Sequence, residues 1–216
     1  MKFCSVDGCE NKYLAKDYCQ KHYYQIYRNG KLAERTIYDS NALLIKDNTC
    51  LIFLYDRYGK KVAEAIIDVE DIEKVRGRKW GLEKGYPFSR TKDKIYLHQL
   101  ILGKTPKGKE IDHKNTNPLD NRKENLRFCT HSQNLQNSNS RTGSSAYKGV
   151  SWDKERKKWF TCIRINKKTV ALGRFNNEAE AAIAYDDEAL KSFGKFARLN
   201  NPHVTQMECK GLTNGL

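Results

Sequence analysis

Residues 96–137 read YLHQLILGKTPKGKEIDHKNTNPLDNRKENLRFCTHSQNLQN, and this stretch decides the fold expected for the middle of the chain. It carries an Asp112-His113 pair, then a polar loop, and then a helix start at Thr130. Thr130 with Gln133 three residues later fits a capping box, in which two side chains bond the free N–H groups of a helix start. We therefore expect a hairpin and a helix that flank a groove.

Asp112 and His113 combine the two groups that hydrolysis of a phosphodiester needs. A carboxylate suits a hard cation such as Mg²⁺, and an imidazole titrates near neutral pH and can activate a water. Adjacent residues of a strand point to opposite faces, so the pair needs separate roles or a local bend. Asn134, in the first turns of the expected helix, is placed to return towards Asp112 as a second oxygen ligand.

The loop PLDNRKENLR, residues 118–127, lies between the pair and the helix. Asparagine side chains bond nearby backbone groups and hold tight turns. Asn125 is expected to brace this loop, and Asn121 competes with it for that role.

Together these residues resemble the HNH endonucleases, whose ββα-metal fold joins two strands and a helix around one divalent ion. The resemblance rests on Asp112-His113, on Asn125 as the central asparagine and on Asn134 in place of the final histidine, a variant familiar among phage and intron-borne homing enzymes. It implies that His113 is the general base and that Asn125 braces the catalytic loop. It also implies that Asp112 and Asn134 hold one Mg²⁺ or Mn²⁺ ion. His98 resembles an upstream histidine of the family. The resemblance makes it a candidate catalytic residue, but we favour a structural or phosphate-facing role.

Simpler explanations exist for each of these features. A lone Asp-His pair is usually a surface feature, and loops rich in asparagine are usually turns. Here several elements of one motif follow in order, which favours a nuclease. A nuclease fold that has lost catalysis and is retained for binding is a further alternative.

The first residues of the chain contain Cys4, Cys9, Cys19 and His22 in the pattern C-x4-C-x9-C-x2-H. Three thiolates and one imidazole suit tetrahedral Zn²⁺, whose binding would supply the folding free energy of a segment too short for its own core. Cys19 and His22 would share one face of a helix capped by Asp17. We expect structural zinc here, with unrelated residues or redox cysteines as the alternatives.

The composition indicates a basic, polar protein made of several small modules. The chain of 216 residues has 40 Lys and Arg against 26 Asp and Glu, a net charge of +14, which favours a polyanionic partner because neutralised phosphates release counterions. Only 38% of residues are hydrophobic and the mean hydropathy is −0.81, so one large core is not expected. The chain shows no apolar leader and no apolar run of membrane length. We therefore expect a cytoplasmic protein of a bacterial host or phage-infected cell, associated with the nucleoid and not with a membrane.

Residues 147–175 read YKGVSWDKERKKWFTCIRINKKTVALGRF and predict three short strands, with a helix in the following residues 177–194. Basic residues dominate the strands and acidic residues the helix, which puts the positive potential on the sheet. A twisted sheet can enter a major groove, where Lys and Arg contact phosphates and bases. A charged, solvated face is the alternative.

This segment resembles the Apetala-type (ethylene-response-factor) DNA-binding domain of plants, because YKGV, LGRF, AEAAIAYD and FARLN match in order. Ser151-Trp152 departs from the plant domains, which carry more arginine there, so the DNA sequence read is open. The resemblance implies DNA contacts from six basic residues: Lys148, Lys154, Arg156, Lys158, Arg164 and Arg174.

The region before the nuclease motif is expected to be a β-rich scaffold. CLIFLYD (50–56) and KVAEAIID (61–68) predict one hairpin, and YPFSR (86–90) and KIYLHQLIL (94–102) predict another. The fold class is therefore α+β with several modules. Their predicted ranges are a zinc-finger-like unit at 1–34, an HNH nuclease domain with its scaffold at 35–137, a linker at 138–146, an Apetala-type domain at 147–203 and a tail at 204–216.

The function expected from these modules is site-specific cleavage of double-stranded DNA by a homing-type endonuclease. One HNH site in a monomer on DNA predicts a nick, and the linker would tether the DNA-reading module to the cutting module. The alternative is a sequence-specific DNA-binding regulator with a vestigial nuclease fold, which the intact set of Asp112, His113 and Asn134 disfavours. An RNA-binding protein is a third hypothesis, but the aromatic signatures of common RNA modules are absent.

Overall fold

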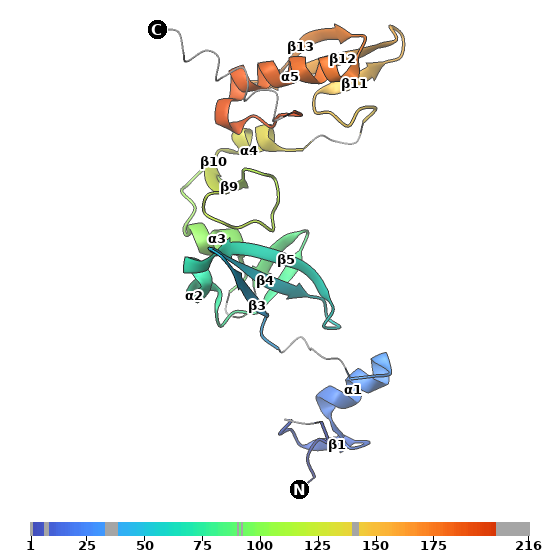
Figure 1. The fold of residues 1–216 in the computed structure, drawn as a ribbon, viewed down its shortest axis with the longest axis vertical. Helices are drawn as coiled ribbons and strands as arrows, with labels where there is room; N and C mark the ends of the chain where they lie inside the picture. The colour runs from blue at the N-terminus through green and yellow to red at the C-terminus, as the bar shows by residue number, and fades with distance from the viewer. Residues whose placement is uncertain are drawn as a thin grey trace. The chain divides into compact units, whose positions relative to one another are not determined.

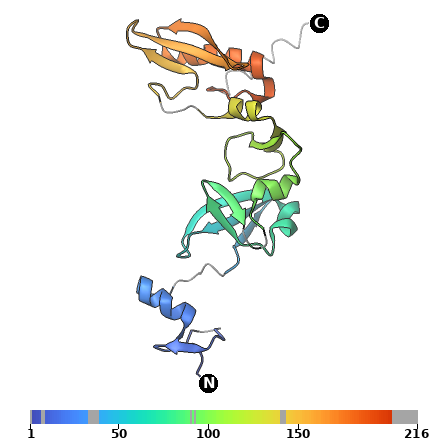
Figure 2. The same ribbon diagram turned by 180° about the vertical axis from the view of Figure 1, so that it is seen from behind.

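The computed structural model describes residues 2–6, 9–32, 39–89, 91, 93–139 and 143–201. The chain forms two compact units, one of Met1–Ile101 with Leu119–Asn121 and one of Leu102–Pro118 with Arg122–Leu216. Figure 1 and Figure 2 show the small sheets and their helices from opposite sides. No helix among the described residues is long and apolar enough to cross a membrane. The mixture of small sheets and few helices agrees with the α+β class.

The first unit begins with a short hairpin and a helix: β1 (Tyr13–Ala15), β2 (Tyr18–Cys19) and α1 (Gln20–Asn29). α1 ends at Gly30, whose φ of 70° lies in the left-handed region that glycine adopts without strain. Asp17 lies in the turn between the two strands with φ of 65°, and Cys19 takes the N-cap position of α1. The prediction that Asp17 caps this helix is therefore wrong, because the hairpin extends to Cys19.

The scaffold opens with an antiparallel sheet in the order β3 (Leu43–Lys46), β4 (Thr49–Tyr55) and β5 (Lys61–Asp68). Cys50, Ile52 and Leu54 of β4 are fully buried and alternate with half-buried residues, as expected of a strand with one face on a core. The hairpin predicted for 50–56 and 61–68 is confirmed. Two short helices follow, η1 (Val69–Asp71) and α2 (Ile72–Val75).

The second scaffold sheet is antiparallel and contains β6 (Trp80–Glu83), β7 (Tyr86–Ser89) and β8 (Ile95–Tyr96). The hairpin of β7 and β8 is confirmed, but its second strand is far shorter than predicted, because α3 (Leu97–Leu102) takes over. Leu97 and Ile101 are four residues apart and both buried, which is the spacing of one helix face. A short apolar run fits both periodicities, so its pattern alone did not separate them.

Residues 119–121 of the polar loop belong to the first unit. The N–H of Ile66 donates to the Leu119 carbonyl oxygen at 2.8 Å, and the N–H of Asn121 donates to the Ile66 carbonyl oxygen at 2.7 Å. Asn121 is fully buried there, beside β5.

The second unit starts with two strands and a helix, β9 (Glu110–His113), β10 (Leu126–Cys129) and α4 (His131–Asn137). The strands are antiparallel and place Leu126 opposite His113 and Arg127 opposite Asp112. The predicted capping box is confirmed, since Thr130 accepts from the backbone of Gln133 and the Gln133 side chain accepts from the backbone of Thr130.

The unit continues with a sheet in the order β11 (Val150–Asp153), β12 (Lys158–Ile165) and β13 (Lys168–Phe175), followed by α5 (Glu178–Phe193) and η2 (Gly194–Phe196). The predicted three strands and helix are confirmed, and both views show α5 against one face of the sheet (Figures 1 and 2). Ala182, Tyr185 and Ala189 are buried on the side of α5 that faces the sheet. Gly149 has φ of 79°, and a Cβ there would lie 2.1 Å from the Tyr185 ring, so only glycine fits.

Candidate functional site

Asp112 and His113 lie at the end of β9 and are both buried, with 5% of their surface exposed. Because side chains alternate along a strand, the two point to opposite faces of the hairpin. Asp112 faces α4, since its carboxylate is bonded by Asn137 of that helix. The acid and the imidazole can therefore take separate roles, and no local bend is needed to bring them to one face.

The carboxylate of Asp112 has two cationic or polar neighbours. Nε and Nη2 of Arg127 both lie 2.7 Å from its Oδ2, and Nδ2 of Asn137 donates to Oδ1 at 2.9 Å. The same amide nitrogen lies 2.9 Å from the carbonyl oxygen of His113, so Asn137 also holds the backbone beside the imidazole. Arg127 holds one carboxylate oxygen, and the Asn137 amide nitrogen lies within hydrogen-bond distance of both.

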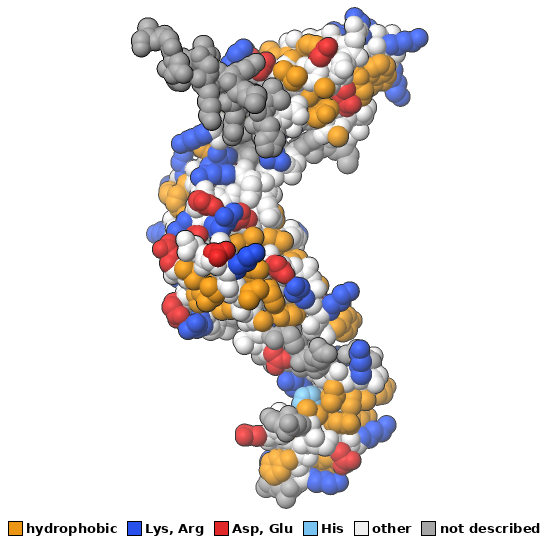
Figure 3. All heavy atoms as spheres, viewed as in Figure 1, with side chains coloured by type: hydrophobic (Ala, Val, Ile, Leu, Met, Phe, Trp, Pro, Cys, Tyr) orange, Lys and Arg blue, Asp and Glu red, His pale blue; other side chains and the backbone are white. Residues whose placement is uncertain are grey.

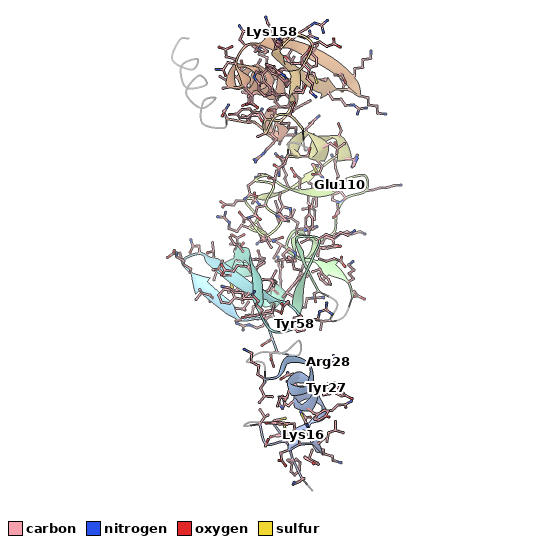
Figure 4. The ribbon with its side chains drawn as sticks, turned by 90° about the vertical axis from the view of Figure 1, so that its right-hand side faces the viewer. Lys16, Tyr27, Arg28, Tyr58, Glu110 and Lys158 are labelled. Carbon is pink, nitrogen blue, oxygen red and sulfur yellow. The ribbon has the colours of Figure 1, made fainter. Side chains whose placement is uncertain are left out.

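Asn134, expected beside Asp112, bonds a different carboxylate in the structure. Its Nδ2 donates to Oε2 of Glu110 at 2.7 Å, and Nδ1 of His131 lies 2.9 Å from Oε1 of the same residue. The hydrogen bond from Asn134, and after it that from His131, hold the pKa of Glu110 below its usual value. Figure 4 labels Glu110 in the hairpin beside α4. Residues 134 and 137 of α4 thus face residues 110 and 112 of β9, one pair each.

Asn137 was missed from the sequence, although a signal for it existed. It is 3% exposed and stands three residues after Asn134, so both amides lie on one helix face. A second asparagine at that spacing could have been weighed as the neighbour of Asp112.

Asn125 braces the turn after His113. Its Oδ1 accepts from the N–H of Asn115 at 3.0 Å, and its Nδ2 donates to Oδ1 of Asn115 at 3.0 Å. Its own carbonyl oxygen accepts from the N–H of Lys114 at 2.8 Å. Asn125 is thus placed as the loop brace, whereas Asn121, the competitor, is built into the neighbourhood of β5.

His98 lies on α3 in the first unit, between two aromatic rings. Its ring is stacked on Tyr96 with centroids 5.7 Å apart and meets Tyr86 edge-on at 5.8 Å. This packing fits the structural role that was favoured for His98.

The four residues of the N-terminal pattern come together, and one ligand atom from each lies within 4.8 Å of all the others. Sγ of Cys9 lies 3.9 Å from Sγ of Cys19, and sulfurs bound tetrahedrally to zinc at 2.3 Å lie about 3.8 Å apart. Nδ1 of His22 lies 3.1 Å from Sγ of Cys4, and burial lowers the pKa of His22, which favours the neutral imidazole that binds metals. The cluster can therefore hold a metal ion such as zinc.

The C-terminal sheet and its β11–β12 turn carry most of the basic residues expected to contact DNA. Lys154, Arg156, Lys158 and Arg164 are exposed. Figure 3 shows Lys and Arg side chains projecting from this part of the chain, and Figure 4 labels Lys158 on it. Arg174 is also exposed, but its Nε bonds Oδ2 of Asp153 at 2.9 Å.

Lys148 differs from these five residues. Its ammonium donates to the carbonyl oxygens of Gln136 and Ser138 at the end of α4, and its burial lowers its pKa to about 8. The Lys148 side chain therefore points to the end of α4 and not to the exposed face of the sheet.

Comparison with known proteins agrees with the motif. A family model described as HNH endonuclease matches residues 96–136. "Uncharacterized HNH endonuclease L560" of Acanthamoeba polyphaga mimivirus is 31% identical over 179 residues, which are 80% of this chain and 92% of that protein. "Protein 3.8" of Escherichia phage T7 is 41% identical over 66 residues, 30% of this chain and 54% of that protein. No solved structure matches.

Proposed function

Because this chain belongs to the HNH endonuclease family, we propose that it is a site-specific, homing-type endonuclease that nicks double-stranded DNA with one divalent ion and a histidine base. The observation that carries the proposal is the buried Asp112-His113 pair at the end of β9, closed by α4. It would act as a monomer in the cytoplasm of a bacterial or phage-infected cell.

His113 is the proposed general base. An imidazole accepts a proton from water near neutral pH, and general-base groups typically contribute about 10²- to 10⁴-fold in rate. Asn125 holds the turn that follows His113, and Asn137 bonds the His113 carbonyl oxygen, so two asparagines fix the backbone that leaves the base.

The donor set beside the base fits a hard divalent ion. Asp112 offers carboxylate oxygen, and the asparagines of α4 that face β9 carry amide oxygens as well as the nitrogens that bond its carboxylates. Carboxylate and amide oxygens are ligands that Mg²⁺ and Mn²⁺ prefer. When bound, the ion would stabilise the negative charge that develops on the phosphate and the leaving oxygen. The resemblance assigns the second ligand to Asn134, whereas the geometry favours Asn137, because its side chain and not that of Asn134 lies beside Asp112. Asn137 would bind the ion through Oδ1.

The Cys4, Cys9, Cys19 and His22 cluster is the proposed structural zinc site. With four protein ligands, no position is left for a substrate or a water, so the site serves folding and not catalysis. Metal analysis should give about one zinc per chain, absent from Cys4→Ser, and a native protein without zinc would refute the assignment.

The C-terminal sheet is the proposed reader of duplex DNA, as an Apetala-type domain. Five exposed basic residues support this role: Lys154, Arg156, Lys158, Arg164 and Arg174. Asp153 ties Arg156 and Arg174 together through its carboxylate, which would orient two of the five before DNA arrives.

The most direct test of the whole proposal is incubation of the protein with a random DNA library and Mg²⁺, followed by mapping of the ends. Site-specific nicking predicts single-strand breaks that share a sequence at a constant offset. Breaks without a shared sequence would refute site specificity, paired breaks would refute nicking, and bound but uncut DNA would favour the regulator hypothesis.

A further inference from the structure

The end of α4 is bonded by the C-terminal module, which comprises β11 to β13, α5 and η2 with their flanking residues (147–201). The last carbonyl groups of a helix lack partners within the helix and carry partial negative charge. Nζ of Lys148 donates to two of the carbonyl oxygens at this end, those of Gln136 and Ser138. The positive side chain thus caps the helix that carries the amides of the nuclease site.

Lys148 is itself fixed within its module. Its N–H donates to Oδ1 of Asn200 at 2.7 Å, and Nδ2 of Asn200 donates to the Lys148 carbonyl oxygen at 3.2 Å. The N–H of Asn200 in turn donates to the buried carboxylate of Asp186 on α5 at 2.7 Å. The ammonium that caps α4 is therefore held in place by hydrogen bonds that reach α5 of the C-terminal module.

A second contact joins the same module to the site carboxylate. Nε and Nη2 of Arg127 bond Oδ2 of Asp112, while Nη1 donates to the carbonyl oxygen of Lys195 in η2. The centre of the guanidinium lies 4.2 Å from the centroid of the Phe196 ring, also in η2. The Arg127 side chain is only 13% exposed. One planar group is thus held between the proposed metal ligand and the module, which a flexible lysine could not reproduce.

We infer that the C-terminal module is a docked part of the nuclease centre, with Arg127 positioning Asp112 and Lys148 positioning α4, and not a reader that swings on a tether. This inference rests on the proposed function of the Asp112 site. One contact holds the carboxylate of β9 and the other holds the helix with the facing amides. The seating of the module therefore sets the spacing of the two sides of the site. It also fixes the offset between the bases that the module contacts and the phosphate at His113.

The docking itself is tested without Mg²⁺ and without cleavage. Amide hydrogen exchange is measured in Mg²⁺-free buffer on the full, zinc-loaded chain and on Lys148→Met and Phe196→Ala. The amides of β9 and α4 should exchange faster in both variants, by about tenfold or more, because loss of the docking contacts makes local opening of these elements easier. Arg76→Ala, which breaks an exposed pair with Glu73 in the first unit, is the control and should match wild type. Unchanged exchange at β9 and α4 in both variants would overturn the docking.

The role of Arg127 as a positioning residue is tested with Arg127→Lys, which keeps the charge. In single-turnover cleavage it should raise the Mn²⁺ concentration for half-maximal rate by about tenfold. Its DNA affinity should stay unchanged, which a misfolded variant would not show. A variant with wild-type Mn²⁺ dependence would exclude the positioning role.

The offset is tested by inserting a flexible Gly-Ser segment of about six residues between Ser140 and Arg141. A docked module predicts an unchanged cut position for the insertion alone and a spread of positions when Lys148→Met and Phe196→Ala are added. A cut that moves or spreads with the insertion alone would overturn the inference. If wild type binds DNA but never cuts it, the proposed function fails, while the exchange measurement still decides the docking.

Discussion

Two asparagines on one face of α4 decide which amide completes the proposed metal site. Asn134 bonds Glu110 and Asn137 bonds Asp112, and the two are one helical turn apart. The family pattern indicates the first of them, and the hydrogen bonds indicate the second.

Mn²⁺ affinity of single alanine variants separates the two asparagines. Loss of a ligand or of the group that orients it typically costs about 10- to 100-fold in metal affinity. If Asn137 is the ligand, Asn137→Ala should show this loss in a calorimetric titration of the zinc-loaded protein and Asn134→Ala should not. The reverse result would restore Asn134, and unchanged affinity in both variants would remove α4 from the site.

Lys148 predicts a specific dependence of stability on pH. Burial lowers its pKa from 10.5 to about 8, so between these values the unfolded chain binds more protons at this group than the folded chain. The free energy of unfolding therefore increases because of Lys148 as pH rises through about 8 towards 10.5, and well below pH 8 the group contributes no slope.

Urea unfolding at pH 7.5 and pH 9.5 measures this effect as a difference from Lys148→Met, which cancels the titration of other groups. Relative to the variant, wild type should become more stable at the higher pH. A constant or opposite difference would show that the ammonium keeps its ordinary pKa on the α4 carbonyl groups.

Among the elements, α4 has the clearest local cause. Its capping box satisfies N–H groups at its start, and Lys148 satisfies carbonyl groups at its end. A helix of one to two turns is not stable alone, so both ends matter to the amides between them.

Thr130→Ala removes one side of the capping box and should lower the free energy of unfolding by about 1 kcal/mol. The loss should appear in urea unfolding and as faster exchange at the start of α4. Ser132→Ala, an exposed position in the first turn of the same helix, serves as the matched control. Equal stability of the two variants would mean that the cap bonds contribute nothing.

Elements with local causes were predictable from the sequence. The cap at Thr130, the β4–β5 hairpin and the sheet and helix after residue 147 follow from adjacent residues and appear as expected. Elements with ambiguous or distant causes were not. Residues 97–102 fit both a strand and a helix, and burial of Leu97 and Ile101 decided for the helix.

The candidate site shows the same division. The pair Asp112-His113 and the brace Asn125 could be named from type and spacing. The partners of Asp112 could not, because Arg127 reaches it across the register of two strands and Asn137 across the packing of a helix. The capping contact of Lys148 depends on the docking of parts far apart in sequence, which no local pattern contains.

In the whole molecule, the positive charge of the C-terminal sheet should govern binding to DNA. Each phosphate contact that is lost should reduce the slope of log affinity against log salt by about 0.9. The double variant Lys158→Ala/Arg164→Ala should therefore bind duplex DNA with a slope smaller by about 1 to 2. Lys191→Ala on α5 is the control and should keep the wild-type slope. An unchanged slope in the double variant would move the DNA contact off this sheet.

The central claim is that an acid group, amide oxygens and an imidazole at the end of β9 hydrolyse DNA together. The most direct measurement compares nicking of supercoiled plasmid in Mg²⁺ by wild type and by His113→Ala, with a gel-shift assay of both. We predict that the variant binds DNA as tightly as wild type but nicks it about 10²- to 10⁴-fold more slowly. Nicking by His113→Ala at the wild-type rate would contradict the account.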